Sequence, residues 1–228
     1  MQNHFTLKPF EFDLFCGMDV DKRSISLTFA SHDGFVKSLK IPYDSTNLIS
    51  YVRRQFGNQR MAFVYEAGPT GFGLYDDLIN QGYFCLVVAP THISRAPAER
   101  GKTNRIDSRK LAEKLRGGDL KGIHVPSRLY RDLRHLVHLR ETFVRHQQAT
   151  KLRIKMLLLF EGIRFPSTTP KERWSTLAMS QLAKLEMSSE IRFKLDQYLL
   201  AHELGRQQLK TANKRLLQFC ITNPELRQ

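Results

Sequence analysis

Three acidic residues, Asp19, Glu66 and Asp107, occupy positions from which carboxylates can act together on one substrate. Asp19 follows the apolar run LFCGM, and Glu66 follows the apolar run MAFVY. Both runs are typical of buried strands. If these two strands are adjacent and parallel, the two carboxylates meet at one edge of the sheet.

Two close carboxylates repel each other and raise one pKa unless a cation lies between them. Mg²⁺ takes oxygen ligands and prefers one or two carboxylates together with phosphate oxygens. Asp107, at the start of a predicted helix, provides a third ligand. We therefore predict that Asp19, Glu66 and Asp107 form one carboxylate cluster that binds Mg²⁺. Each acid also has an ordinary interpretation, because Asp107 suits a helix N-cap and Asp19 suits a turn together with Asp21.

The elements that position these acids alternate between strands and helices. His32-Asp33-Gly34 is a turn signal between two strand-like runs, which predicts an antiparallel hairpin. The run MAFVY is apolar at every position, as expected of a central strand covered on both faces. This pattern predicts a mixed α/β sheet with flanking helices. The predicted strands cover 14–20, 24–30, 35–41, 61–65 and 83–88, and the predicted helices cover 46–56, 71–80 and 108–117.

From residue 128 onward the pattern changes to long helices over 128–161 and about 189–222, separated by a linker at 162–170. Thr169-Pro170-Lys171-Glu172 fits a helix capping box. The last helix has a heptad seam that predicts a coiled coil with a partner helix, either the 128–161 helix or another subunit. Its members are Ile191, Leu195, Tyr198, His202, Gly205, Leu209, Ala212, Leu216 and Phe219.

The first long helix has an impure seam, because Arg140, Gln147 and Thr150 interrupt it, and we expect these residues to face nucleic acid. The chain thus divides into a predicted catalytic domain at 1–125 and a helical region at 126–228. The second region is predicted to mediate oligomerisation and to contact nucleic acid.

Positive charge is concentrated in the middle of the chain. The net charge of the protein is +14, but residues 1–99 carry −1, residues 100–160 carry +11 and residues 161–228 carry +4. Such a local excess repels itself without a partner and indicates a polyanion, with nucleic acid the first candidate. The predicted phosphate-binding residues are Lys102, Arg105, Arg109, Lys110, Lys114, Arg116, Arg128, Arg131, Arg134, Arg145, Lys151, Arg153 and Lys155.

Other compartments and classes fit the sequence less well. No apolar run approaches the length of a membrane span, and residues 1–15 lack the layout of a signal peptide. The three cysteines are widely spaced, which excludes a zinc ribbon or a disulfide framework. A cytoplasmic location, associated with the bacterial nucleoid, is the expectation.

Four segments carry a resemblance to a known family. They are GMDVDK (17–22), YEAGPTGFGLY (65–75), VVAP (87–90) and GKTNRIDSRKLAEKLRGGDL (101–120), in that order. Together they resemble the DEDD transposases of bacterial insertion sequences, which include the Piv-type DNA invertases. The resemblance implies a RuvC-like, ribonuclease-H-like domain whose four acids bind Mg²⁺ and act on DNA. It also implies guidance by a structured bridge RNA and assembly as a dimer or tetramer.

By position, Asp19 matches the first acid, Glu66 the second and Asp107 the fourth, while the third falls on Asn104. An amide oxygen can coordinate Mg²⁺ but carries no charge, so this departure weakens the prediction of nuclease activity and not that of the fold. The family's C-terminal serine domain has no counterpart here. We therefore expect a chain truncated before that domain, which does not complete recombination alone.

Two other classes remain as alternatives. Actin-like sugar kinases share the ribonuclease-H topology, but they need a second glycine-rich phosphate-binding block that is absent from this sequence. A non-catalytic DNA- or RNA-binding module with a vestigial acid site is favoured by Asn104. Cleavage of DNA that depends on Mg²⁺ distinguishes the module from an active enzyme.

Overall fold

The computed structural model describes residues 7–90, 104–166 and 174–227. The chain falls into two compact units, Met1–Val125 and Pro126–Gln228. Each unit is described by itself. Within the described residues, no helix is long and apolar enough to cross a membrane.

The first unit is built on a five-stranded mixed sheet in the order β3-β2-β1-β4-β5. It is consistent with a ribonuclease-H-like α/β fold. The β2–β3 hairpin turns at Gly34, whose φ of 133° favours glycine. The condition under which Asp19 and Glu66 meet at one edge of the sheet is fulfilled, because β1 and β4 are adjacent and parallel. The strands are β1 (Leu14–Val20), β2 (Ser24–Ser31), β3 (Gly34–Pro42), β4 (Met61–Glu66) and β5 (Phe84–Val88).

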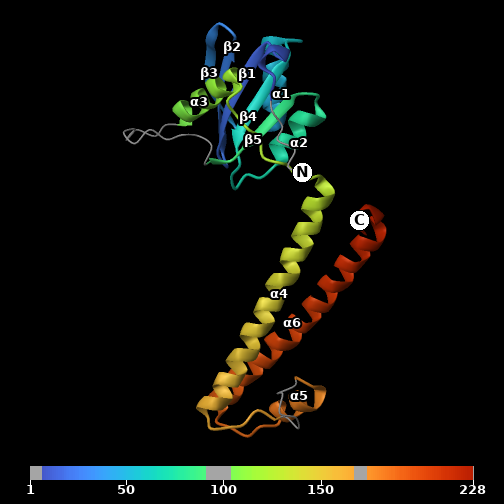
Figure 1. The fold of residues 1–228 in the computed structure, drawn as a ribbon. Coiled ribbons are helices and arrows are strands. Elements are labelled where there is room, and N and C mark those ends of the chain that lie inside the picture. Colours follow the sequence, from blue (N-terminus) through green and yellow to red (C-terminus); the bar gives the residue numbers. More distant parts are fainter. Residues whose placement is uncertain (1–6, 91–103, 167–173, 228) are drawn as a thin grey trace. The chain divides into compact units, whose positions relative to one another are not determined.

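Helices cover both faces of this sheet (Figure 1). On one face, α1 (Ser45–Phe56) and α2 (Gly73–Asn80) bury Leu48, Val52 and Leu78 against the strands. The helix α1 begins at an Asp44 cap, whose carboxylate accepts hydrogen bonds from the backbone N–H groups of residues 46 and 47. On the other face, α3 (Asn104–Gly117) contributes Leu111 and Leu115 to a second core.

The second unit is a hairpin of two long helices, α4 (Arg128–Phe160) and α6 (Ser189–Thr222), with the short α5 (Thr176–Ala183) near their junction (Figure 1). Ser127 and Ser175 cap α4 and α5 through their hydroxyls. The predicted capping box at 169–172 lies outside the described residues. Two short 3-10 turns, at Pro9–Glu11 and Pro224–Arg227, are the remaining elements of the described residues.

The seam predicted on the last helix is buried or half-buried along its whole length, and its partner in this chain is α4. The Gln147 side-chain amide donates to the His202 carbonyl at 3.1 Å, and Arg140 donates to the Asn213 side chain at 2.8 Å. These pairings make the hairpin antiparallel.

The expectation that the interruptions of the α4 seam face nucleic acid is wrong for two residues. Gln147 and Thr150 are buried, at 8% and 7% exposure. The Gln147 side chain lies against Gly205, where an added Cβ would be 2.9 Å from its Oε1. The physical reason is complementarity, because the polar and small positions of one helix meet those of the other. The third residue, Arg140, directs its guanidinium to α6 through the bond to Asn213.

Candidate active site

Asp19 and Glu66 lie side by side at the carboxyl ends of β1 and β4. The parallel register pairs Met18 with Tyr65, and Asp19 and Glu66 are the next residues along the two strands. Neighbouring strands are separated by about 4.8 Å. Both residues are half-buried. The structure thus brings the first two predicted acids to one edge of the sheet.

Both acids are on the face of the sheet that α3 covers. Side chains alternate along a strand, and Phe15, two pleats before Asp19, packs in the core beneath α3. Val64 and Ala62, which are two and four residues before Glu66 and so point to the same side of β4, belong to the same core. Asp19 and Glu66 therefore share one face as well as one edge.

Asp107 approaches this face from the first turn of α3. It lies one helical turn before Leu111, which packs in the core of the same face. The predicted helix began at residue 108, but α3 begins at Asn104. Asp107 is therefore not the N-cap residue. Its negative charge in the first turn stabilises α3 through the helix dipole. The side chain of Asn104 lies outside the described part of the structure.

Gly17 sets how closely α3 lies on β1. A Cβ at this position would be 2.1 Å from the Ser108 carbonyl oxygen and 2.4 Å from the Ala112 backbone nitrogen. Only glycine permits this approach of helix to strand. Gly17 is two residues before Asp19, so the contact also fixes the distance between Asp19 and the first turn of α3.

A buried chain of hydroxyls holds the same turn. The Thr28 hydroxyl is 2.9 Å from that of Ser108 and 2.8 Å from that of Ser38. Ser108 is fully buried and Thr28 is 1% exposed, so the pairing satisfies polar groups that have no access to water. Gly17, Thr28 and Ser108 were not predicted from the sequence as positioning residues. The signal that could have identified Gly17 is a glycine inside an otherwise apolar strand.

Hydrogen bonds from the sheet hold the segment 67–71, which follows Glu66. The Tyr65 hydroxyl donates to the Gly71 carbonyl at 3.1 Å, and burial raises the pKa of Tyr65 well above its usual range, so it stays a donor. The Ala67 backbone N–H donates to the Val88 carbonyl at 2.8 Å. The YEAGPTG motif therefore fixes the backbone on both sides of the Glu66 carboxylate.

The carboxylate oxygens at this edge are the kind of ligand that a hard divalent cation takes, but the described side chains do not form a complete set of ligands. Within residues 7–90, 104–166 and 174–227, no three His, Cys, Asp or Glu side chains gather closely enough to hold a metal ion. Asp19 and Glu66 both have interaction partners in this structure. Two adjacent carboxylates with further oxygen ligands from a phosphate are the arrangement in which Mg²⁺ is usually held. The pair Asp19 and Glu66 fits that role, with Asp107 on the same face.

Several of the basic residues predicted to surround the acids have interaction partners within the protein. Lys102 and the side chain of Arg105 lie outside the described part. Arg109 forms an ion pair with Glu113 at 2.9 Å, and its guanidinium lies 5.4 Å from the centre of the Phe35 ring. Arg116 donates to the His32 carbonyl at 2.9 Å. Lys110 is half-buried and Lys114 has a partner of its own.

The basic residues of α4 fall into two groups. Arg128 pairs with Asp132, Arg131 is half-buried, and the ammonium groups of Lys151 and Lys155 lie over the rings of Trp174 and Phe165. Their centroid distances are 5.6 and 6.0 Å, so these lysines help to pack the second unit. The second group is exposed to solvent and consists of Arg134, Arg145 and Arg153.

The known proteins that this chain is similar to are transposases. A family model of transposases, DEDD_Tnp_IS110, matches residues 16–161. The putative transposase y4qE of Sinorhizobium fredii is 38% identical over 117 residues, covering 51% of this chain and 29% of that protein. The transposase for insertion sequence element IS1533 of Leptospira borgpetersenii is 24% identical over 217 residues, covering 92% of this chain and 62% of that protein. The chain therefore spans less than two thirds of the length of either relative.

Proposed function

Because this chain belongs to the IS110 family of DEDD transposases, we propose that it acts on DNA at the sheet edge formed by Asp19 and Glu66. The reaction is Mg²⁺-dependent strand cleavage and exchange. The observation that carries the proposal is the register of β1 and β4, which puts both carboxylates next to each other on the face covered by α3.

In this proposal the acids at this edge of the sheet would hold the metal ion. Asp19 and Glu66 would provide two carboxylate ligands, and Asp107 would provide a third from the first turn of α3. A bound Mg²⁺ supplies Lewis-acid stabilisation of the charge that develops on a phosphate oxygen. The chain's own contribution is the fixed backbone around each acid, through Gly17 on one side and Tyr65 on the other.

We further propose that a structured guide RNA selects the DNA. The support is the net charge of +11 over residues 100–160 and the exposed guanidiniums of Arg134, Arg145 and Arg153. Contacts to phosphates position a strand but do not read its sequence. Sequence recognition by base pairing to an RNA is compatible with such a surface.

Self-association through the second unit is part of the same proposal. Three apolar side chains of α6, those of Phe193, Leu200 and Leu204, are 65%, 64% and 56% exposed. Leu204 also lines a groove of about 480 Å³ together with Leu136, Leu139 and Phe143. Light scattering at micromolar concentration tests this step, and a monomer at all concentrations would contradict it.

The metal site is tested with matched acid-to-amide variants. Titration calorimetry with Mn²⁺ or Mg²⁺ compares the wild type with Asp19→Asn and Glu66→Gln. The control is Asp21→Asn, which removes the same charge from an exposed turn residue whose side chain accepts from the Lys22 N–H. We expect at least tenfold weaker binding for the first two variants and little change for the control. Equal affinity in all four proteins would contradict the proposed site.

The non-catalytic alternative is decided by the same proteins. A nucleic-acid-binding module retains binding of DNA and RNA but shows no metal-dependent nicking of supercoiled DNA in the wild type. An active site shows nicking that Asp19→Asn and Glu66→Gln abolish and Asp21→Asn leaves in place. The absence of a closed three-carboxylate group among the described residues is the observation that keeps the alternative open.

A further inference from the structure

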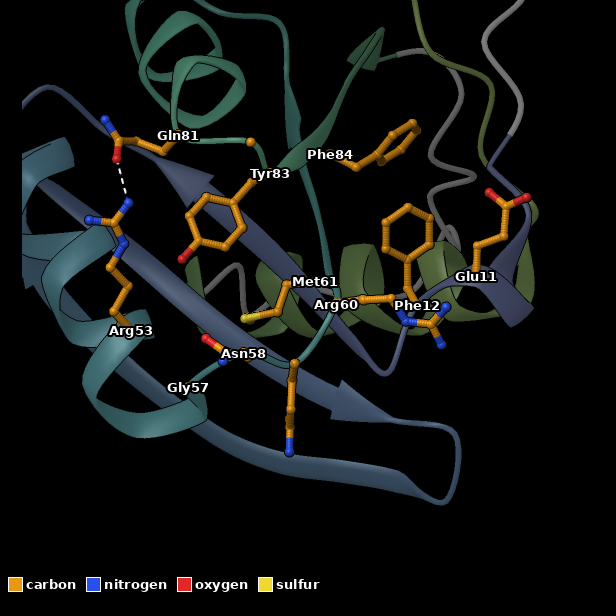
Figure 2. Close-up of a pocket in the computed structure, with 12 residues that line it drawn as sticks. Glu11, Phe12, Arg53, Gly57, Asn58, Arg60, Met61, Gln81, Tyr83 and Phe84 are labelled. Atoms are coloured by element: carbon orange, nitrogen blue, oxygen red, sulfur yellow. Dashed lines mark hydrogen bonds between the residues drawn. The ribbon is translucent and has the colours of Figure 1, made fainter.

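A cavity in the first unit lies at the sheet edge opposite the acids. It has a volume of about 550 Å³ and lies where β4 begins at Met61 and β5 begins at Phe84 (Figure 2). Glu66 is at the other end of β4, about 16 Å away by the rise of a strand. A ligand in this cavity is therefore separate from one at Asp19 and Glu66.

One part of the cavity wall is aromatic. The rings of Phe12 and Phe84 are 5.2 Å apart, and Tyr83 packs edge-on against Phe63 at 5.3 Å. Figure 2 shows the Tyr83 ring on one side of Met61 and the Phe12 ring on the other. Phe12, Tyr83 and Phe84 are only half-buried, so aromatic surface remains available to a planar ligand.

The other part of the wall is polar and already held in place. Arg53, at the end of α1, donates to the side-chain oxygen of Gln81 at 2.5 Å (Figure 2). Arg60 forms an ion pair with Asp13 at 3.1 Å, and the Arg60 backbone N–H donates to the same carboxylate at 2.9 Å. Asn58 adds a side-chain amide. Both guanidiniums are thus oriented before any ligand arrives.

We propose that this cavity binds an unpaired nucleotide of a single-stranded nucleic acid. A nucleobase presents a planar face for the aromatic wall and a polar edge for the amides of Asn58 and Gln81. Its phosphate is attracted by Arg53, whose partner Gln81 is neutral, whereas Arg60 is already paired with Asp13. Stacking on aromatic side chains with a cationic contact is the usual way in which proteins hold unpaired bases. The inference rests on the proposed function, since a protein that works with a structured RNA and with opened DNA meets unpaired nucleotides.

The test uses an isosteric change with a matched control. Gln81→Glu keeps the shape of the wall but adds a negative charge beside Arg53, and it replaces a donor with an acceptor. Gln55→Glu adds the same charge to the last turn of α1 outside the cavity. Binding of fluorescein-labelled ten-nucleotide single strands is followed by anisotropy. We expect Gln81→Glu to weaken binding by about tenfold, within the range of one stacked base, and Gln55→Glu to weaken it less than twofold.

Photo-crosslinking identifies the contact directly. Strands that contain 4-thiouracil are irradiated on the full chain, and crosslinked peptides are identified by mass spectrometry. The proposal expects crosslinks in peptides that contain Tyr83 and Phe84, with RNA, DNA and free nucleoside monophosphates compared as ligands. Crosslinks confined to α4, or equal affinity of the Gln81→Glu and Gln55→Glu variants, would overturn it. Failure at the cavity leaves the Asp19→Asn metal titration unchanged, so the two proposals fail separately.

Discussion

Gly17 and Ser108 are in direct contact across the boundary between β1 and α3, with room for a hydrogen atom at Gly17 and nothing larger. The Ser108 carbonyl oxygen would be 2.1 Å from a Cβ at Gly17. The partner in this contact is helix backbone, which cannot rotate away as a side chain can. The contact therefore determines where α3 lies and, with it, where Asp107 lies.

Gly17→Ala is predicted to destabilise the first unit by about 3 kcal/mol, at the upper end of the cost of overpacking, because α3 has to move as a body. Urea unfolding measures the change. Gly73→Ala is the control, since no atom lies within 4 Å of a Cβ there and its φ is not positive. The control should be neutral or more stable by up to about 1 kcal/mol. Equal stability of the two variants would contradict the packing argument.

Nucleic-acid affinity should depend on the exposed arginines of α4. Replacing Arg134, Arg145 and Arg153 by alanine removes up to three phosphate contacts, and the slope of log affinity against log salt for duplex DNA should fall by up to about 2.7. Filter binding at several salt concentrations gives the slope. In contrast, Lys151→Ala and Lys155→Ala remove cations that lie over Trp174 and Phe165. These two variants should lower the free energy of unfolding of the second unit and leave the salt slope nearly unchanged. A lower salt slope with unchanged stability would contradict the packing role of Lys151 and Lys155.

The second unit should lose stability in mild acid through His202. This residue is 3% exposed, and its ring is stacked on Trp174 at 4.9 Å. Neither ring nitrogen has a hydrogen-bond partner among the described residues. Burial lowers the pKa of His202, with Lys151 and Arg206 acting in the same direction and Glu203 opposing them.

Because the unfolded chain binds a proton more readily than the folded chain, the free energy of unfolding falls as the pH drops below about 6.5. The slope for this one group is at most about 1.4 kcal/mol per pH unit. Trp174 is the one tryptophan of the chain, so its fluorescence reports unfolding of this region. His202→Phe keeps the ring stacking and should flatten the pH dependence. His146→Gln, at an exposed position of α4, should leave it unchanged.

Gln147 and Gly205 should be energetically coupled. A Gly205→Ala change gains helix propensity of about 1 kcal/mol but places a methyl group 2.9 Å from Gln147 Oε1. In a Gln147→Ala background that contact is absent, so the same change should be more stabilising. Thermal unfolding of the two single variants and the double variant gives the coupling. Strict additivity would show that the Gln147 side chain moves aside at no cost.

The sequence alone determined the element types and their order. Periodicity and turn residues identified all five strands, and the seam from Ile191 to Phe219 identified the face of α6 that packs, because burial repeats with the period of the backbone. That the strands of Asp19 and Glu66 are adjacent and parallel was only a condition at the sequence level, and the structure meets it. Helix α5, the two 3-10 turns and the true starts of α2 and α3 were not predicted, because local signals for short helices and helix ends are weak.

Only the tertiary structure decided which side chains are buried, which lie against a ring and which face solvent. In the sequence Gln147 and Thr150 interrupt the seam of the first long helix, and only the antiparallel pairing of α4 with α6 buries them and joins Gln147 to His202. The sequence counts Lys151 and Arg145 as equal charges, but one lies over a tryptophan ring and the other faces solvent. The cavity between Arg53 and Phe84 joins residues from separate elements and has no motif at all. The physical reason is that side chains far apart in sequence become neighbours only after the elements pack.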